Sequence, residues 1–376
     1  MKAGAGVKAG FRSRVSASLP DFPWDTLTGA KAAAAAHPGG IVDLSVGTPV
    51  DPVPALIRDA LAAGSGFPGY PTTIGTVELR RAAASSLARR HGVTGLDESG
   101  ILPVIGTKEA IAGLTSLLGI GAGDTVVIPE VAYPTYEVSA LLAGANAVRA
   151  DSTLQLGPSA PALMFINSPS NPTGKVLGVD HLRKVVGWAR ERGTVLVSDE
   201  CYLGLCWDDE ALSILDPRVC DGDHTGLLAV HSLSKISNLA SYRAGFLAGD
   251  PELIGELLAV RKHAGLMVPF PVQTAMTAAL DDDAHVDEQR ERYRARREIL
   301  LGAVTAAGFR VDDSEAGLYL WATRDEPCRD TVAWLAERGI LAAPGDFYGP
   351  AGVRHVRMAL TATDERIAAA RDRLSA

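Results

Sequence analysis

Short apolar segments alternate with longer amphipathic segments through the first two thirds of the chain. The apolar segments are four or five residues long and end in glycine, proline or polar residues, as buried strands do. The segments between them carry apolar residues at helical spacing. This alternation predicts an α/β fold with a mostly parallel central sheet. The predicted strands are residues 102–105, 124–128, 163–166, 194–198 and 227–230.

The pattern changes after a long predicted helix that ends near residue 307. Beyond it the predicted strands are shorter and surround a single helix, which indicates a smaller α+β domain packed against the first. The first residues are rich in glycine, alanine and serine, which is typical of a loose terminal arm. The predicted parts are a flexible N-terminal arm at 1–20, a large ligand-binding domain at 48–283, and a small domain made of 21–47 and 284–376.

Composition narrows the range of partners. The formal net charge of −8 argues against nucleic acid or an anionic membrane surface. No run approaches the ~18 apolar residues of a membrane span, and the N-terminal residues lack the apolar core of a signal peptide. We therefore expect a cytoplasmic protein with no membrane partner. The four cysteines show no metal-ligand spacing, which predicts no metal site.

Two conspicuous motifs have plain structural explanations. The arginines between residues 290 and 297 are interleaved with glutamates, which predicts the solvated face of a long helix. Residues 64–69 match G-x-G-x-x-G, the pattern of a dinucleotide-binding turn. Such a turn must follow a strand and open a helix, whereas this one follows a predicted helix and runs into Pro71. We therefore reject a dinucleotide site there.

A lysine follows the last predicted strand of the large domain. Strand 227–230 ends in the hydroxyl-rich turn Ser232-Leu233-Ser234, which Lys235 follows directly, and Arg243 comes eight residues later. Open α/β sheets bind ligands at the carboxyl ends of their strands. A phosphate-bearing aldehyde would suit this group, because the amine forms a Schiff base while hydroxyls and guanidinium hold the phosphate. A surface lysine after a strand remains the structural alternative.

Other predicted strands of the large domain end in polar or aromatic residues. Thr107 and Lys108 begin a helix, whose free N–H groups form an anion site. Tyr133 follows the next strand and could stack on a ring. Asn171 lies between two prolines, and Asp199 ends an apolar strand, where a carboxylate needs a partner. Each has an ordinary alternative, such as a turn-former or a satisfied core aspartate. Together they indicate one bound ligand.

Arg357 lies within a predicted strand of the small domain, between apolar residues. A buried guanidinium there needs a carboxylate, which is either structural or brought by a substrate.

In this order, the motifs resemble those of fold type I pyridoxal-5′-phosphate (PLP) enzymes, in the class I/II aminotransferase family. The resemblance covers nearly the whole chain after residue 20. Within the family, the chain is most similar to actinobacterial succinyldiaminopimelate aminotransferases through residues 22–27, 43–54 and 343–349. Many relatives have glycine two residues before the phosphate-binding arginine, where this chain has Ser241. We expect Ser241 to alter the local turn and not the chemistry.

The resemblance implies a role for each residue of the cofactor's reactive end. Lys235 would be the Schiff-base lysine, Asp199 would pair with the ring nitrogen N1, and Tyr133 would stack on the ring. Asn171 and Tyr202 would bond the 3′-oxygen. Lys235, Asp199 and Tyr202 are thus the predicted catalytic residues.

The resemblance also implies the remaining contacts. Arg357 would bind the substrate α-carboxylate, and Gly47 would line the same pocket. The enzyme would be a homodimer, because Tyr70 would reach the phosphate of the neighbouring subunit. The residues implied to hold the phosphate within one subunit are the backbone of Thr107 and Lys108 and the side chains of Ser232, Ser234 and Arg243.

The leading hypothesis is ping-pong amino transfer from N-succinyl-LL-2,6-diaminopimelate to 2-oxoglutarate, or the reverse, in lysine and diaminopimelate biosynthesis. The substrates would be an amino acid and a 2-oxo acid. The alternatives that keep the cofactor are an aspartate, alanine or aromatic aminotransferase and a C–S lyase. Those of another class are a non-catalytic effector-binding relative and a serine acyl-enzyme built on S-x-x-K. The acyl-enzyme lacks its partner motifs, since the chain contains neither K-T-G nor S-x-N.

Overall fold

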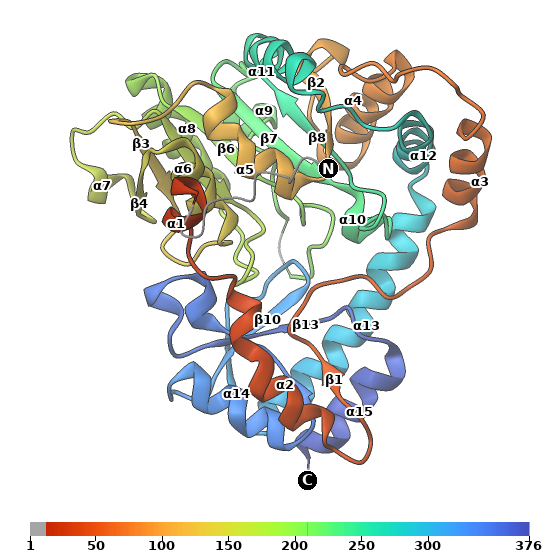
Figure 1. Ribbon diagram of the computed structural model, residues 1–376, viewed down its shortest axis with the longest axis vertical. Helices are drawn as coiled ribbons and strands as arrows, with labels where there is room; N and C mark the ends of the chain where they lie inside the picture. Colours follow the sequence, from red (N-terminus) through yellow and green to blue (C-terminus); the bar gives the residue numbers. More distant parts are fainter. Residues whose placement is uncertain (1–12, 209, 376) are drawn as a thin grey trace, which may run out of the picture.

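The computed structural model describes residues 13–208 and 210–375. Most of the predicted arm, residues 1–12, lies outside the described residues. The described part of that arm contains α1 (Arg14–Ser18), a short helix capped by the Ser13 hydroxyl. The chain forms a larger upper part around one sheet and a smaller lower part around another (Figure 1).

The larger sheet has seven strands in the order β2-β8-β7-β6-β5-β3-β4. All neighbours from β7 to β4 pair in parallel, whereas β8 pairs antiparallel with both β2 and β7. The predicted α/β fold with a mostly parallel sheet is therefore confirmed. The strands are β2 (Ile101–Ile105), β3 (Thr125–Ile128), β4 (Asn146–Arg149), β5 (Leu163–Asn167), β6 (Val195–Asp199), β7 (Leu227–Ser232) and β8 (Ala244–Gly249).

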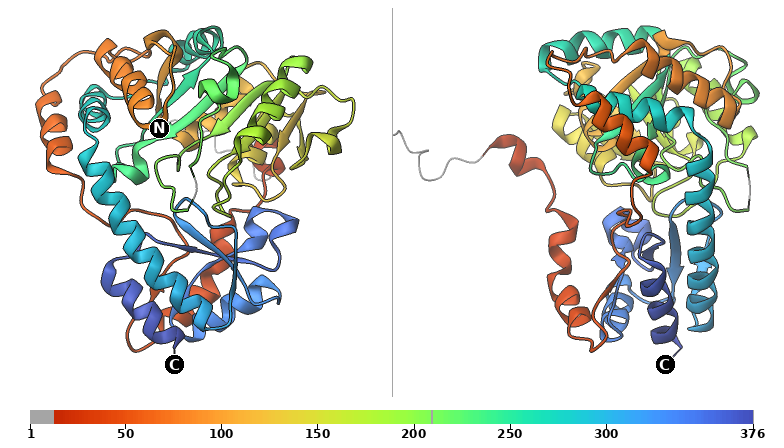
Figure 2. Two further views of the ribbon diagram at one scale, coloured as in Figure 1. Left: turned by 180° about the vertical axis from the view of Figure 1, so that it is seen from behind. Right: turned by 90° about the vertical axis from the view of Figure 1, so that its right-hand side faces the viewer.

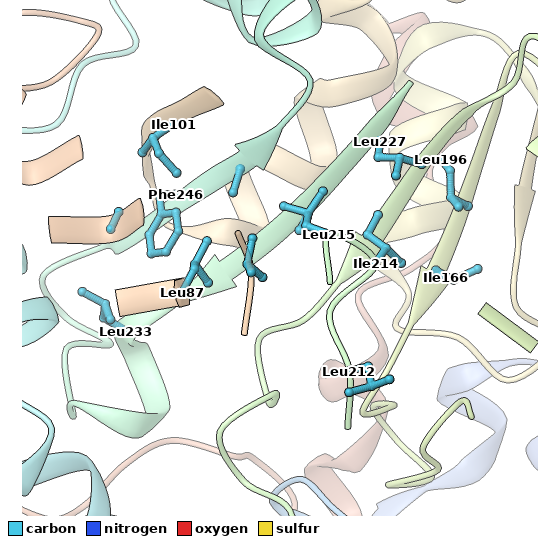
Figure 3. Close-up of a cluster of buried hydrophobic side chains, with 14 of the residues drawn as sticks. Leu87, Ile101, Ile166, Leu196, Leu212, Ile214, Leu215, Leu227, Leu233 and Phe246 are labelled. Carbon is cyan, nitrogen blue, oxygen red and sulfur yellow. The ribbon is translucent and has the colours of Figure 1, made fainter. Parts of the chain in front are cut away.

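Helices cover both faces of this sheet (Figures 1 and 2). Neighbouring residues of one strand pack into separate cores, with Leu196 on one face and Val197 on the other. Figure 3 shows part of the first of these cores, in which Leu196 and Leu227 lie on neighbouring strands and Phe246 lies further across the sheet on β8. None of the described helices is long and apolar enough to cross a membrane. The main helices are α3 (Ala55–Gly64), α4 (Val77–His91), α5 (Thr107–Leu117), α6 (Thr135–Ala143), α8 (Val179–Arg192), α11 (Pro251–Ala264) and α12 (Phe270–Asp281).

The smaller sheet is antiparallel, in the order β12-β13-β10-β9. A separate parallel pair joins β1 near the N-terminus to β11. The helix α13 (Ala284–Ala306) runs from the upper part into the lower part (Figure 2). The domain boundaries given above stay a prediction. The elements are α2 (Thr28–Ala35), β1 (Val42–Asp43), β9 (Arg310–Asp312), β10 (Tyr319–Thr323), α14 (Cys328–Glu337), β11 (Ile340–Leu341), β12 (Ala343–Pro344), β13 (Val356–Ala359) and α15 (Asp364–Leu374).

The arginine-rich part of α13 is not uniformly solvated, so that prediction was wrong for one member. Arg296 is 3% exposed and lies on one helical face with the buried residues Gln289 and Tyr293, seven and three positions earlier. Its guanidinium holds both oxygens of Asp51, at 2.6 and 2.8 Å. Burial alone would raise the pKa of Asp51, but the hydrogen bonds and charge of Arg296 outweigh it and lower that pKa. This pair ties α13 to the segment before α3.

Candidate active site

A pocket of about 550 Å³ opens where the carboxyl ends of β5, β6 and β7 face the smaller sheet. Both sheets and the segment before α2 contribute to its lining. Twelve of the thirteen residues predicted for the site line this one pocket. They are Gly47, Thr107, Lys108, Tyr133, Asn171, Asp199, Tyr202, Ser232, Ser234, Lys235, Arg243 and Arg357.

Tyr70 is the predicted residue that this pocket does not include. It lies between α3 and α4 and is 94% exposed. Its side chain is therefore accessible to another chain. Its predicted place in the site of a neighbouring subunit stays a prediction.

The start of α5 forms the anion-binding end of the pocket. Gly106 precedes the helix with a φ of 79°, and a Cβ there would fall 2.1 Å from the Arg243 guanidinium. Glycine is therefore needed both for the turn and for the close approach of the arginine. On the other side, the Ser232 hydroxyl accepts a hydrogen bond from the Ser234 N–H at 3.1 Å. A helix start, a guanidinium and two hydroxyls suit a phosphate dianion.

Lys235 lies on the single turn α10 (Leu233–Ile236), directly after β7. Its Nζ donates a hydrogen bond to the carbonyl oxygen of Gly47. Burial lowers the pKa of the Lys235 amine; the positive charges of Arg357 and Arg243 add to this effect, whereas Tyr319 opposes it. A lysine with a lowered pKa is closer to the neutral form that acts as a nucleophile or base.

Asp199 ends β6 as a buried carboxylate. Its Oδ2 accepts a hydrogen bond from the Tyr136 hydroxyl at 2.7 Å, and its Oδ1 accepts one from the Cys201 N–H at 3.1 Å. Burial raises the pKa of Asp199, and these hydrogen bonds partly offset the increase. Within the described structure no cation forms an ion pair with Asp199. A protonated ring nitrogen would provide the missing charge.

Arg357 on β13 is 3% exposed. It donates to Asn171 Oδ1 at 2.8 Å and to the carbonyl oxygen of Ser45 at 2.7 Å, and its Nε has no partner among the described residues. Its Cζ lies 3.9 Å from the centre of the Tyr319 ring. No carboxylate of the described chain neutralises this guanidinium, so the site suits the carboxylate of a substrate.

Several residues in or behind the pocket escaped the prediction. Tyr136, behind the pocket lining, donates a hydrogen bond to Asp199, and Tyr319 in the lining lies against Tyr202 and Arg357. Both are single aromatic residues within a helix or strand, with no motif around them. Residues of the N-terminal segment also line the pocket, and among them only the aromatic character of residues 22–24 was a signal. These lining residues are Phe22, Trp24, Leu27 and Lys31.

The described residues contain no group of three or more His, Cys, Asp or Glu side chains that could hold a metal ion. The chemistry of the donor set instead matches an anionic, ring-bearing cofactor with an aldehyde. The pocket has an anion cradle formed by the start of α5, Ser232, Ser234 and Arg243. It also has an amine with a lowered pKa and a buried carboxylate without a cation.

An α/β fold with this lysine, aspartate and anion cradle at its strand ends defines a PLP-dependent enzyme. Residues 40–374 match the family model described as aminotransferase class I and II, so the chain belongs to that family. Members of the family depend on PLP, and the residues of this pocket fit that cofactor.

Named relatives agree with this assignment. The chain is 70% identical over 364 residues to a probable aminotransferase of Mycobacterium tuberculosis, covering 97% of this chain and 87% of that protein. It is 60% identical over 357 residues to the 4-dedimethylamino-4-oxo-anhydrotetracycline transaminase OxyQ of Streptomyces rimosus, covering 95% and 99%. Among solved structures, an aminotransferase of Neisseria meningitidis has a TM-score of 0.84 at 31% identity, covering 96% and 99%. The protein is therefore a PLP-dependent aminotransferase.

Proposed function

We propose that this aminotransferase exchanges an amino group between N-succinyl-LL-2,6-diaminopimelate and 2-oxoglutarate. Residues 22–27, 43–54 and 343–349, which resemble succinyldiaminopimelate aminotransferases, support this substrate. A relative from Dehalococcoides mccartyi that is named LL-diaminopimelate aminotransferase is 30% identical over 347 residues, covering 87% of this chain and 88% of that protein. The observation that carries an amino-acid substrate is the buried Arg357 guanidinium, which has no carboxylate partner in the described chain and shares a pocket with Lys235.

The pocket residues divide the work as follows. PLP, when bound, supplies a ring that delocalises the electron pair left after the substrate α-carbon loses its proton. Arg357 holds the α-carboxylate and so orients the bond to that proton. Lys235 Nζ accepts the proton that the α-carbon loses, and would pass it to the cofactor carbon that carried the aldehyde. Asp199 keeps the ring nitrogen protonated, since its own carboxylate is buried and negatively charged. Tyr202 and Asn171 would donate to the ring oxygen.

A second candidate substrate class is a ketone on a fused-ring scaffold. It is favoured by the 60% identity to OxyQ, whose name gives an oxo-anhydrotetracycline as its substrate. Such a substrate has no α-carboxylate for Arg357 to bind. The two candidates therefore predict opposite consequences when this arginine is replaced.

The deciding experiment is the half-reaction of the PLP-loaded enzyme, followed by its visible absorbance. N-succinyl-LL-diaminopimelate, glutamate, aspartate and alanine would be added separately, to wild type and to Arg357→Gln. Conversion by the succinylated amino acid at low concentration, with loss in Arg357→Gln, is the expected result. Conversion by glutamate alone would keep the aminotransferase and reject the succinylated substrate. Amination of a fused-ring ketone by apoprotein loaded with pyridoxamine phosphate, which needs no amino-acid donor, would favour the second candidate if it survives Arg357→Gln.

We also propose that the active enzyme is a homodimer in which Tyr70 contacts the phosphate of the neighbouring subunit. The exposure of Tyr70 on the single chain supports this arrangement. Sedimentation should give the mass of two chains. Tyr70→Phe should bind PLP more weakly without dissociating the dimer, since one hydrogen bond to a charged group is lost.

A further inference from the structure

Tyr319 lies against three other residues of the pocket, Tyr202, Arg357 and Gly47. It begins β10 and is only 4% exposed. Its hydroxyl is 3.0 Å from the hydroxyl of Tyr202, and the Arg357 guanidinium lies on its ring, at 3.9 Å from the ring centre. Through this side chain the smaller sheet contacts Tyr202, one of the two predicted 3′-oxygen ligands.

The Tyr319 hydroxyl occupies the space that a side chain at position 47 would need, and position 47 is a glycine. A Cβ at Gly47 would fall 2.3 Å from the Tyr319 hydroxyl oxygen and 2.9 Å from its ring. Gly47 does not have the positive φ that would itself require glycine. Its missing side chain is therefore explained by the tyrosine hydroxyl, which a larger residue would displace. The carbonyl oxygen of Gly47 accepts the hydrogen bond from Lys235, so the backbone here is part of the site.

The direction of the Tyr319–Tyr202 hydrogen bond follows from a count of hydrogens. Each hydroxyl has one hydrogen to donate. If Tyr202 donates its hydrogen to the ring oxygen of the cofactor, it must accept one from Tyr319. We propose that Tyr319 is a positioning residue, which donates to Tyr202 and thereby directs the Tyr202 hydrogen to the cofactor's ring oxygen. This inference rests on the proposed role of Tyr202.

The inference predicts a spectroscopic effect. Hydrogen bonds donated to the ring oxygen favour its deprotonated form. Loss of the Tyr319 hydroxyl should weaken the bond from Tyr202 and raise the pH midpoint of the visible absorbance of the PLP-loaded enzyme. The expected shift in Tyr319→Phe is about half a pH unit, the size of part of one hydrogen bond. The affinity of the apoprotein for PLP should fall about threefold for the same reason.

The test is a double-mutant cycle on that midpoint, with PLP affinity as a second readout. Because Tyr319 acts only through Tyr202, Tyr319→Phe should shift the midpoint in wild type and leave it unchanged in a Tyr202→Phe background. Tyr348→Phe is the matched control, since Tyr348 is also buried beside Arg357, 5.2 Å from it, and its hydroxyl has no partner among the described residues. Gly47→Ala, which displaces the same hydroxyl without removing it, should reproduce the shift.

Two results would overturn the inference. The first is an unchanged pH midpoint: Tyr319→Phe and Gly47→Ala would both have the same midpoint as the wild type and the control Tyr348→Phe. The other is a shift of the same size with and without the Tyr202 hydroxyl, which would mean that Tyr319 acts directly or through the general fold. If Tyr319→Phe does not fold, Gly47→Ala carries the test. An enzyme with no visible band in the presence of PLP would instead reject the proposed function itself.

Discussion

The two sheets contribute to the pocket in different ways. The seven-stranded sheet contributes groups at or just beyond the carboxyl ends of its strands, among them Asn171, Asp199 and Lys235. The four-stranded sheet contributes side chains from within its strands, Tyr319 on β10 and Arg357 on β13. These two strands are neighbours with a fixed register, so their side chains hold a constant spacing.

This difference matches the two tasks proposed for the pocket, which are amino transfer and recognition of the substrate. Turns after strands can direct different groups to one point, which suits an amine and a carboxylate that are proposed to act on the same ring. Side chains on the face of a paired sheet are held by the register of the whole sheet, which suits a fixed anchor for a substrate carboxylate. Replacements at the strand ends should therefore abolish the reaction, and replacement of the sheet-face Arg357 should mainly weaken substrate binding.

The largest effect is expected at the strand end itself. Lys235→Ala should lower the rate of amino transfer by at least about 10³-fold, because it removes the group proposed to move the proton. Steady-state assays with glutamate as donor would measure this loss. Lys108→Ala is the matched control, because its exposed side chain lines the same pocket and only its backbone is predicted to bind phosphate. Equal losses in both variants would contradict the distinct role of Lys235.

Arg357→Gln tests the role of the four-stranded sheet in substrate binding. It should lower kcat/KM for amino-acid substrates by about 10²- to 10³-fold, mostly through KM, because a buried charge–carboxylate contact is lost. Glutamine keeps a donor for Asn171 Oδ1, which otherwise would lose its partner. PLP affinity, measured on the same variant, should change little. A loss confined to kcat would place Arg357 among the reacting groups instead.

The same contrast explains which site residues could be predicted from the sequence. Strand-end residues have a local signature, since Lys235 and Asp199 each come within five residues after an apolar run. Arg357 could be singled out because a charge within an apolar strand is rare. Tyr136 and Tyr319 are apolar enough to belong to a core, and their hydroxyls gain meaning only from residues 63 and 117 positions away. No local pattern carries that information.

The fold shows the same limit at two strands that were not predicted. β4 is a partly exposed edge strand with no apolar run. β8 contains Gly245 and Gly249, which disfavour a strand by propensity. Packing requires both glycines. A Cβ at Gly249 would fall 2.1 Å from the carbonyl oxygen of Leu227, and a Cβ at Gly245 would fall 2.9 Å from the carbonyl oxygen of His231. Close approach of β8 to β7 thus overrides the propensity of its residues.

Behind the strand ends, a buried acid offers a test through pH. Glu200 follows Asp199; its Oε1 accepts a hydrogen bond from the Ile214 N–H at 2.8 Å, and its Oε2 lies 3.5 Å from His231 Nε2. Burial raises the pKa of Glu200 to about 7 and lowers the pKa of His231 to about 3. Near neutral pH the histidine is therefore uncharged, and the carboxyl group is poised between its two forms.

The sign of the Glu200 effect follows from linkage. Between about pH 4.5 and 7 the folded state binds a proton that the unfolded chain has lost, so this group's contribution to stability falls as pH rises. Relative to wild type, Glu200→Gln should therefore gain roughly 2–3 kcal/mol of unfolding free energy between pH 5 and pH 8. Urea unfolding at both pH values measures it, with Glu337→Gln, on the exposed end of α14, as the control. A difference that stays constant with pH would show that Glu200 is ionised throughout.

The smallest effect is expected at Tyr136, which supports Asp199, the carboxylate proposed to pair with the ring nitrogen. Tyr136→Phe removes the hydroxyl that donates to Asp199 and keeps the ring that stacks on Phe165, 5.0 Å away. Without this donor the charged form of Asp199 is less stable, so its pKa should rise and its hold on the ring nitrogen should weaken. Amino transfer should fall about tenfold, the value of one hydrogen bond to a charged group. In an Asp199→Asn background the same change should have almost no effect on the rate, because the charge that the hydroxyl stabilises is gone. An equal loss in both backgrounds would mean that Tyr136 supports the packing around β6 and not the charge at its end.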